Sequence, residues 1–84
     1  MAEFTVDDLR RILESSAGVV GIDWADSRTL ETSFNDIGYD SLALLEFSAS
    51  VQRERGIRIP DEDVFEMVTP KLALDYINQR HATA

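Results

Sequence analysis

The apolar residues of this chain recur every three or four positions in separate stretches, which is the spacing of side chains on one face of an α-helix. Thr5 precedes the first stretch as a candidate N-cap, and Gly18 follows it as a suitable stop. Asp7 and Asp8 complement the positive end of the helix dipole. The pattern predicts a helix over residues 5–17 with one apolar stripe formed by Val6, Leu9, Ile12, Leu13 and Ala17.

A second helix is predicted over residues 41–55, opened by Asp40-Ser41 and ended at Gly56. At 100° per residue both of its faces are apolar. One carries Leu44, Phe47 and Val51, and the opposite one carries Leu42, Leu45 and Ala49 beside Glu46 and Arg53. We expect the bulkier stripe, with Phe47, to face the core and Leu45 to face outward. The second stripe either packs on the preceding segment or remains available to a partner protein.

No period holds between residues 18 and 40. A structureless segment of this length is uncommon inside a compact domain, so we expect its apolar side chains to pin it across the bundle. These side chains are Val19, Val20, Ile22, Trp24, Leu30, Phe34 and Ile37.

Two further helices are predicted near the C-terminus. An acidic one covers residues 61–66 after Pro60, and a final one covers residues 70–80, with Thr69 as its cap and Pro70 at its first position. Residues 81–84 should be frayed. The prediction is therefore an all-α fold, a four-helix bundle of three long helices and one short one, forming a single domain over residues 1–84.

Composition restricts the classes of function. The net charge of −8 disfavours binding to nucleic acid and to anionic membranes, and indicates basic protein partners. The chain has no cysteine and one histidine, so thiol chemistry and a Cys/His metal site are excluded. There is neither an apolar run of about 20 residues nor a signal-peptide pattern, so we expect a cytoplasmic protein.

Ser41 is the candidate functional residue. An Asp-Ser pair at a helix start is most often only a cap, and no histidine or lysine that could activate the hydroxyl occurs around it, so catalysis by Ser41 is not expected. A helix N-terminus does stabilise an anion, so a phosphodiester on Ser41 would be well placed.

Four segments carry a resemblance to a known family. The region Phe34-Asn35-Asp36-Ile37-Gly38-Tyr39-Asp40-Ser41-Leu42-Ala43-Leu44-Leu45-Glu46 resembles the prosthetic-group attachment region of acyl carrier proteins, and Gly38-Tyr39-Asp40-Ser41-Leu42-Ala43-Leu44 is similar to the branch of type II (aromatic) polyketide synthases. Residues 57–62, 68–70 and 74–78 resemble the family's third-helix entry and last helix at matching separations.

The resemblance implies that a phosphopantetheinyl transferase uses coenzyme A to attach 4'-phosphopantetheine to Ser41, with Asp40 holding the transferase complex or capping the helix. The thiol of this arm would carry malonyl and poly-β-keto intermediates as thioesters for antibiotic biosynthesis. The chain would be a monomeric carrier, not an enzyme, working with a ketosynthase and chain-length factor, a malonyl transferase and a ketoreductase.

The resemblance also implies a recognition surface around the helix over residues 41–55. Apolar contacts would come from Leu42, Leu45 and Ala49, and carboxylates for basic partners would come from Glu46, Asp61, Glu62, Asp63 and Glu66.

The chain departs from the family at one end of its core. Arg55 replaces the aromatic residue usual before the turn that ends the second helix, and Trp24 and Phe47 are candidates to close the core there. Two alternatives remain: a carrier for fatty acid synthesis, from which Tyr39 argues away, and an acidic helical adaptor in which Ser41 is only a cap.

Overall fold

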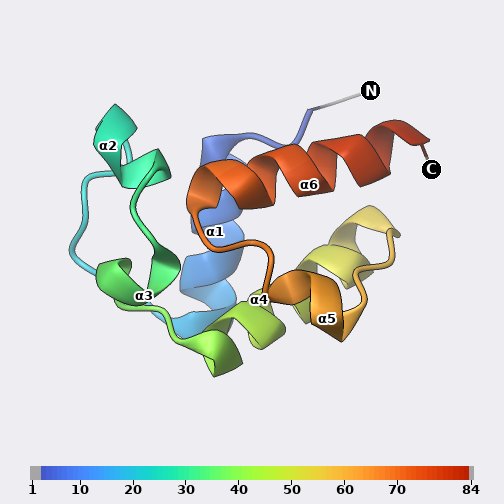
Figure 1. The fold of residues 1–84 in the computed structure, drawn as a ribbon, viewed down its shortest axis with the longest axis horizontal. Coiled ribbons are helices and arrows are strands. Elements are labelled where there is room, and N and C mark those ends of the chain that lie inside the picture. The colour runs from blue at the N-terminus through green and yellow to red at the C-terminus, as the bar shows by residue number, and fades with distance from the viewer. Residues whose placement is uncertain (1–2, 84) are drawn as a thin grey trace.

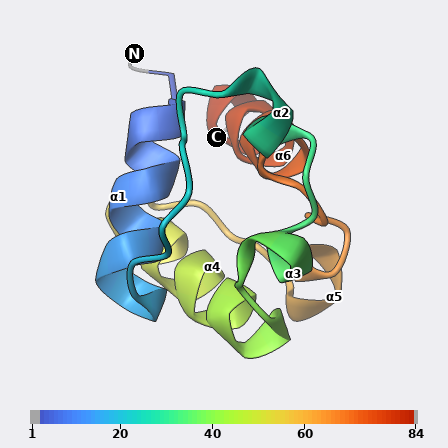
Figure 2. The same ribbon diagram turned by 90° about the vertical axis from the view of Figure 1, so that its left-hand side faces the viewer.

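The structure, a computed structural model, describes residues 3–83 and the side chains of residues 3–80. The helices within this range are α1 (Val6–Ala17), α2 (Ser27–Leu30), α3 (Phe34–Ile37), α4 (Ser41–Arg55), α5 (Asp61–Val64) and α6 (Pro70–Thr83). The long helices α1, α4 and α6 form the frame, and the short helices lie in the connections (Figure 1). In Figure 2, α1 stands on one side and α6 on the other, with α4 running below them. The all-α fold with three long helices is confirmed.

The start of α1 is closed by a reciprocal pair of hydrogen bonds. The Asp8 N–H donates to Thr5 Oγ1 at 3.2 Å, and the Thr5 N–H donates to Asp8 Oδ2 at 3.0 Å. This capping box satisfies two backbone N–H groups that a helix start otherwise leaves unpaired. The predicted cap at Thr5 and the predicted stop at Gly18 are both confirmed.

Residues 18–40 contain more structure than the sequence analysis predicted. The N-caps of α2 and α3 are Asp26 and Ser33, whose side chains accept the backbone N–H groups of Arg28 and Asp36. Asp26 and Ser33 are the local sequence signals that indicate these two helices. Apolar spacing cannot predict them, because a helix of four residues is too short to show a period. Most of the segment's apolar side chains are buried or half-buried, as expected, but Val19 is 76% exposed and does not pin the segment.

The C-terminal helices have different ends from those predicted. The α5 helix stops at Val64, and the chain continues in a tighter turn in which the Met67 N–H donates to the carbonyl of Val64 at 3.1 Å. The final helix begins at Pro70, where Thr69 Oγ1 accepts the Leu72 N–H, and it continues to Thr83. The helix therefore runs three residues beyond its predicted end at residue 80, since no proline or glycine interrupts it there; Ala84 lies outside the described residues. No helix in the described range is long and apolar enough to cross a membrane.

The core brings together side chains from the three long helices. Phe47 is fully buried, as predicted. Leu45 is half-buried and packs against the core, so the expectation that it faces outward is wrong in part. The reason is that α4 lies against both α1 and α5, which cover parts of both of its apolar faces. The buried hydrophobic side chains that the long helices contribute to the core cluster are Leu9, Ile12, Leu13, Leu44, Phe47, Val51, Ala73 and Ile77.

Phe4 closes the core at the end of α4. Its ring is 1% exposed, and the Arg55 guanidinium carbon lies 5.1 Å from the ring centre. The Phe4 backbone donates to and accepts from the Asn78 side chain, which ties it to α6. Arg55 in turn reaches Asp8 at 3.0 Å. The residues predicted for this role are Trp24 and Phe47. Phe4 is not among them, because it precedes the apolar stripe of α1.

Asp8 should make the stability of the protein sensitive to acid. Its carboxyl pKa is below the ordinary value, chiefly because the carboxylate accepts the Thr5 N–H, with the Thr5 hydroxyl and then Arg55 and Arg11 adding to the effect. A depressed pKa contributes stability that is complete above the ordinary value of 3.8 and is lost as the pH falls through the lowered one. We expect Asp8→Asn to lower the free energy of unfolding by about 0.5 to 2 kcal/mol at pH 7, and by less near pH 3. Urea unfolding at both pH values, with Asp7→Asn as control, measures this, and equal losses at the two values would contradict it.

Gly38 should resist replacement. It ends α3 with φ +123°, and a Cβ at this position would lie 3.3 Å from Val20 Cγ1. Left-handed backbone costs an L-residue about 1 to 2 kcal/mol, so Gly38→Ala should lower the free energy of unfolding by at least that amount. Gly21→Ala is the matched control, because its backbone lies outside the positive-φ region and its Cβ would have no neighbour within 4 Å. Equal unfolding midpoints for the two variants in urea would show that Gly38 is not required.

Candidate functional site

Ser41 is the first residue of α4 and is exposed to solvent. Asp40, directly before it, is the N-cap: its Oδ1 accepts the Ala43 N–H at 2.9 Å. The capping role foreseen for Asp40 is therefore present. The other N–H groups of the first turn have no acceptor within the helix, so the hydroxyl of Ser41 stands beside free donors and the positive end of a 15-residue helix.

Tyr39 fixes the chain that leads into Ser41. The ring is 2% exposed, and its hydroxyl donates to the carbonyl of Gly18 at the end of α1 at 2.8 Å. The Tyr39 N–H donates to the carbonyl of Phe34 at 2.8 Å, and the two rings meet edge to face with centres 6.5 Å apart. Burial, and to a smaller extent Glu14, raise the pKa of the phenol, which remains a donor. In the sequence, Tyr39 is only a mark of the family branch; its anchoring role depends on contacts with Gly18 and Phe34 that no local pattern predicts.

A cavity of about 310 Å³ opens beside Ser41. One side is formed by α3 and the start of α4, and the other by the residues that follow α5. Phe65 and Val68 are about half exposed at its rim, and the Phe34 N–H donates to the Val68 carbonyl at 2.8 Å across it. The lining side chains are Ser33, Phe34, Asn35, Tyr39, Asp40, Ser41, Leu44, Phe65, Met67 and Val68.

The cavity has room for part of a bound molecule, but its lining offers few side chains that could catalyse a reaction. Among the described residues, no histidine, lysine or arginine lines it, so none of these side chains is placed to act as a base on the Ser41 hydroxyl. No cluster of three metal-binding side chains occurs among the described residues. The exposed hydroxyl, the free N–H groups and the apolar lining suit a phosphodiester on Ser41 with a chain beside it.

The predicted recognition residues on α4 differ in accessibility. Leu42 is 63% exposed next to Ser41, and Glu46 is exposed one turn further on. Leu45 and Ala49 are half-buried. Glu46 and Arg53 share a helix face, but they form no ion pair among the described residues. Arg53 donates instead to Ser50 Oγ at 3.2 Å.

The predicted acidic residues around α5 also divide into two groups. Asp61, Glu62 and Glu66 are exposed. The Asp63 carboxylate is instead engaged within the chain, where Oδ2 accepts from Tyr76 Oη at 2.5 Å and from Arg80 Nη2 at 3.1 Å. The structure therefore leaves three of these four carboxylates available to a partner.

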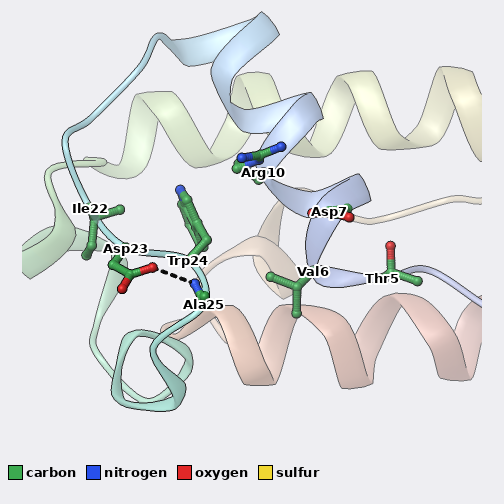
Figure 3. Close-up of a pocket in the computed structure, with 8 residues that line it drawn as sticks. All are labelled: Thr5, Val6, Asp7, Arg10, Ile22, Asp23, Trp24 and Ala25. Carbon is green, nitrogen blue, oxygen red and sulfur yellow. Dashed lines mark hydrogen bonds between the residues drawn. The ribbon is translucent and has the colours of Figure 1, made fainter.

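A second pocket, of about 500 Å³, lies between the start of α1 and residues 22–25 (Figure 3). Trp24 and Arg10 both line it, and Trp24 Nε1 is buried without a hydrogen-bond partner among the described residues. Asp23 Oδ1 accepts the Ala25 N–H at 2.9 Å, which folds the segment into a turn. This pocket shares no residue with the cavity at Ser41.

Comparisons with known proteins agree with this geometry. A family model described as the phosphopantetheine attachment site matches residues 7–77. The chain is 41% identical over 85 residues to the granaticin polyketide synthase acyl carrier protein of Streptomyces violaceoruber, covering 100% of this chain and 99% of that protein. It is 42% identical over 80 residues to the actinorhodin polyketide synthase acyl carrier protein of Streptomyces coelicolor, covering 95% and 93% of the two chains.

Solved structures agree as well. The solution structure of the 3-oxo-butyl acyl carrier protein from the actinorhodin polyketide synthase of Streptomyces coelicolor, titled an intermediate mimic, matches with a TM-score of 0.85 and 45% identity. The match covers 100% of this chain and 99% of that one. The chain therefore belongs to the phosphopantetheine attachment site family and, within it, to the polyketide synthase acyl carrier proteins.

Proposed function

We propose that Ser41 bears the 4'-phosphopantetheine arm and that the chain carries malonyl and poly-β-keto intermediates on it as thioesters. The observation that supports this most directly is the exposed Ser41 hydroxyl at the capped start of α4, beside an apolar cavity. The phosphodiester would lie at the positive end of the helix dipole, which stabilises an anion by about 0.3 to 1 kcal/mol. The arm supplies the thiol that the polypeptide lacks.

We propose that the cavity beside Ser41 receives part of the carried acyl group. Its walls include Phe34, Leu44 and Met67, which favour an apolar chain, while Ser33, Asn35 and the Tyr39 region offer polar atoms for keto oxygens. The half-exposed rim at Phe65 and Val68 leaves a path by which the group can leave. The 3-oxo-butyl group of the actinorhodin relative is a keto-bearing chain of the kind expected here.

We propose that partner enzymes dock on the surface formed by Leu42, Glu46, Asp61, Glu62 and Glu66, which we call the docking surface. Leu42 is an exposed apolar side chain adjoining Ser41, and the four carboxylates are exposed on α4, on α5 and just after α5. Leu45 and Ala49 share the face of α4 that carries Leu42 but are half-buried. The net charge of −8 favours basic surfaces on the partners and faster association with them.

We propose as partners a phosphopantetheinyl transferase, a ketosynthase with its chain-length factor, a malonyl transferase and a ketoreductase. The transferase must reach the Ser41 hydroxyl, and the other enzymes must reach the thiol end of the arm attached to it; Ser41 is exposed at the start of α4. Because loading uses coenzyme A and the partners belong to one synthase, we place this work in the cytoplasm, with the chain acting as a monomer.

Ser41→Ala should remain folded but accept no prosthetic group. Incubation with coenzyme A and a broad-specificity transferase should give a single phosphopantetheinyl addition by mass spectrometry in the wild-type protein and none in the variant. Since Asp40 provides the cap, the loss of unfolding free energy should be small, below about 1 kcal/mol. Ser50→Ala on the same helix is the control and should be modified like the wild type. Modification of Ser41→Ala would overturn the assignment of Ser41.

Glu46→Lys should slow acyl transfer to a type II ketosynthase while leaving the fold intact, because an exposed charge acts mainly on the rate of association. The defect should shrink as salt rises, since the Debye length is about 10 Å at 0.1 M ionic strength and about 3 Å at 1 M. Glu31→Lys, which changes the net charge equally but lies at the end of α2, is the matched control. If the two variants transfer at the same rate in low salt, Glu46 is not part of the docking surface.

A further inference from the structure

The helix α5 is too short to be stable without contacts to the rest of the fold. It has four residues, and no side chain makes a capping hydrogen bond at its start at Pro60. Forming a single helical turn is unfavourable on its own, so a helix this short depends on contacts with the rest of the fold. The contacts that hold α5 therefore also decide the position of the chain that follows it.

Apolar packing supplies one part of these contacts. Val64 is fully buried, and Met67 is 1% exposed. Val64 attaches the end of α5 to the core, and Met67 attaches the turn that follows it, but neither side chain contributes a directional bond. Packing alone resists separation of α5 from the core more strongly than it resists rotation or sliding, because apolar contact is non-directional.

A polar cluster on α6 supplies the directional part. Tyr76 Oη donates to Asp63 Oδ2 at 2.5 Å, Arg80 Nη2 donates to the same oxygen at 3.1 Å, and the Arg80 guanidinium carbon lies 5.0 Å from the centre of the Tyr76 ring. Burial, followed by the hydrogen bond to Asp63, raises the pKa of Tyr76 to about 12, so the phenol stays protonated as a donor at neutral pH. Hydrogen bonds to a charged acceptor are stronger than neutral ones.

This cluster lies next to one wall of the cavity at Ser41. Phe65, Met67 and Val68 line that wall and follow Asp63 within five residues of chain. We propose that Tyr76, Asp63 and Arg80 form a clasp that positions this wall and thereby sets how closely it covers an acyl group carried on Ser41. Tyr76 and Arg80 are positioning residues, since they act on the cavity through α5 and do not line it. The statement about the acyl group depends on the proposed function; the statement about the wall does not.

The first test uses the apo protein. Tyr76→Phe removes the hydroxyl donor and keeps the ring. The matched control is Arg11→Gln, which breaks an ion pair between Arg11 on α1 and Glu54 on α4 and removes no contact of α5. Loss of a hydrogen bond to a charged group should speed amide hydrogen exchange at residues 63–68 by about tenfold or more in Tyr76→Phe, and not in Arg11→Gln. If exchange at residues 63–68 in Tyr76→Phe matches that of the wild type or of Arg11→Gln, the clasp is overturned.

Two variants of Asp63 test the clasp independently, in case Tyr76→Phe does not fold. Asp63→Asn keeps the size of the side chain but removes the charge, and it should also speed exchange at residues 63–68. Asp63→Glu keeps a carboxylate and should restore part of the protection. Equal exchange in Asp63→Asn, Asp63→Glu and the wild type would overturn the clasp as well.

The second test uses protein loaded with an octanoyl chain on the prosthetic arm. In the wild type, nuclear Overhauser effects should connect the octanoyl chain with the methyl groups of Leu44 and Met67. In Tyr76→Phe, the effects to Met67 should weaken. Cleavage of the thioester by hydroxylamine should also be faster in this variant than in the wild type. If the wild type shows no such effect at Leu44 or Met67, the proposal that the cavity receives the acyl group is wrong. The hydrogen-exchange experiment on the apo protein still tests whether the clasp positions the wall. If the contacts and the cleavage rate are unchanged in Tyr76→Phe, the clasp does not govern coverage of the acyl group.

Discussion

The packing of α1 against α4 is the contact on which the rest of this structure depends. Leu9 and Leu13 from α1 and Phe47 and Val51 from α4 are fully buried in one core, and burial of such side chains is the main favourable term in folding. Ion pairs join the same two elements at their edges: Arg11 with Glu54, and Arg55 with Asp8. In a chain with a net charge of −8, these pairs place four charges where they attract instead of repelling.

The cavity at Ser41 has two walls of different character. The wall formed by α3 and the start of α4 is anchored to the rest of the fold, because Tyr39 is buried, hydrogen-bonded to the end of α1 and packed edge to face on Phe34. The other wall follows a four-residue helix without a side-chain cap. A carrier must hold its cargo between reactions and then release it to an enzyme. In the proposed function, Ser41 would hold the arm at an anchored wall, and the contacts of Asp63 with Tyr76 and Arg80 would position the opposite wall.

The acidic side chains of this protein serve different purposes according to their burial. Asp40 and Asp8 cap helices, and Asp63 accepts hydrogen bonds from α6, so their carboxylates are used within the chain. Glu46 and Glu62 are exposed and keep their charge available to other proteins. A count of carboxylates near Ser41 therefore overstates the charge offered to a partner, because part of it is neutralised or engaged inside the fold.

The sequence by itself determined the three long helices, their caps at Thr5, Asp40 and Thr69, the burial of Phe47 and the position of Ser41, because these follow from local signals: apolar spacing and the capping of free N–H groups. Tertiary structure alone decided that Phe4 closes the core under Arg55, that Leu45 is half-buried and that Asp63 bonds to Tyr76. Each of these joins residues distant in sequence, or depends on which neighbour covers a helix face. Periodicity shows that a face is apolar but does not show what lies against it.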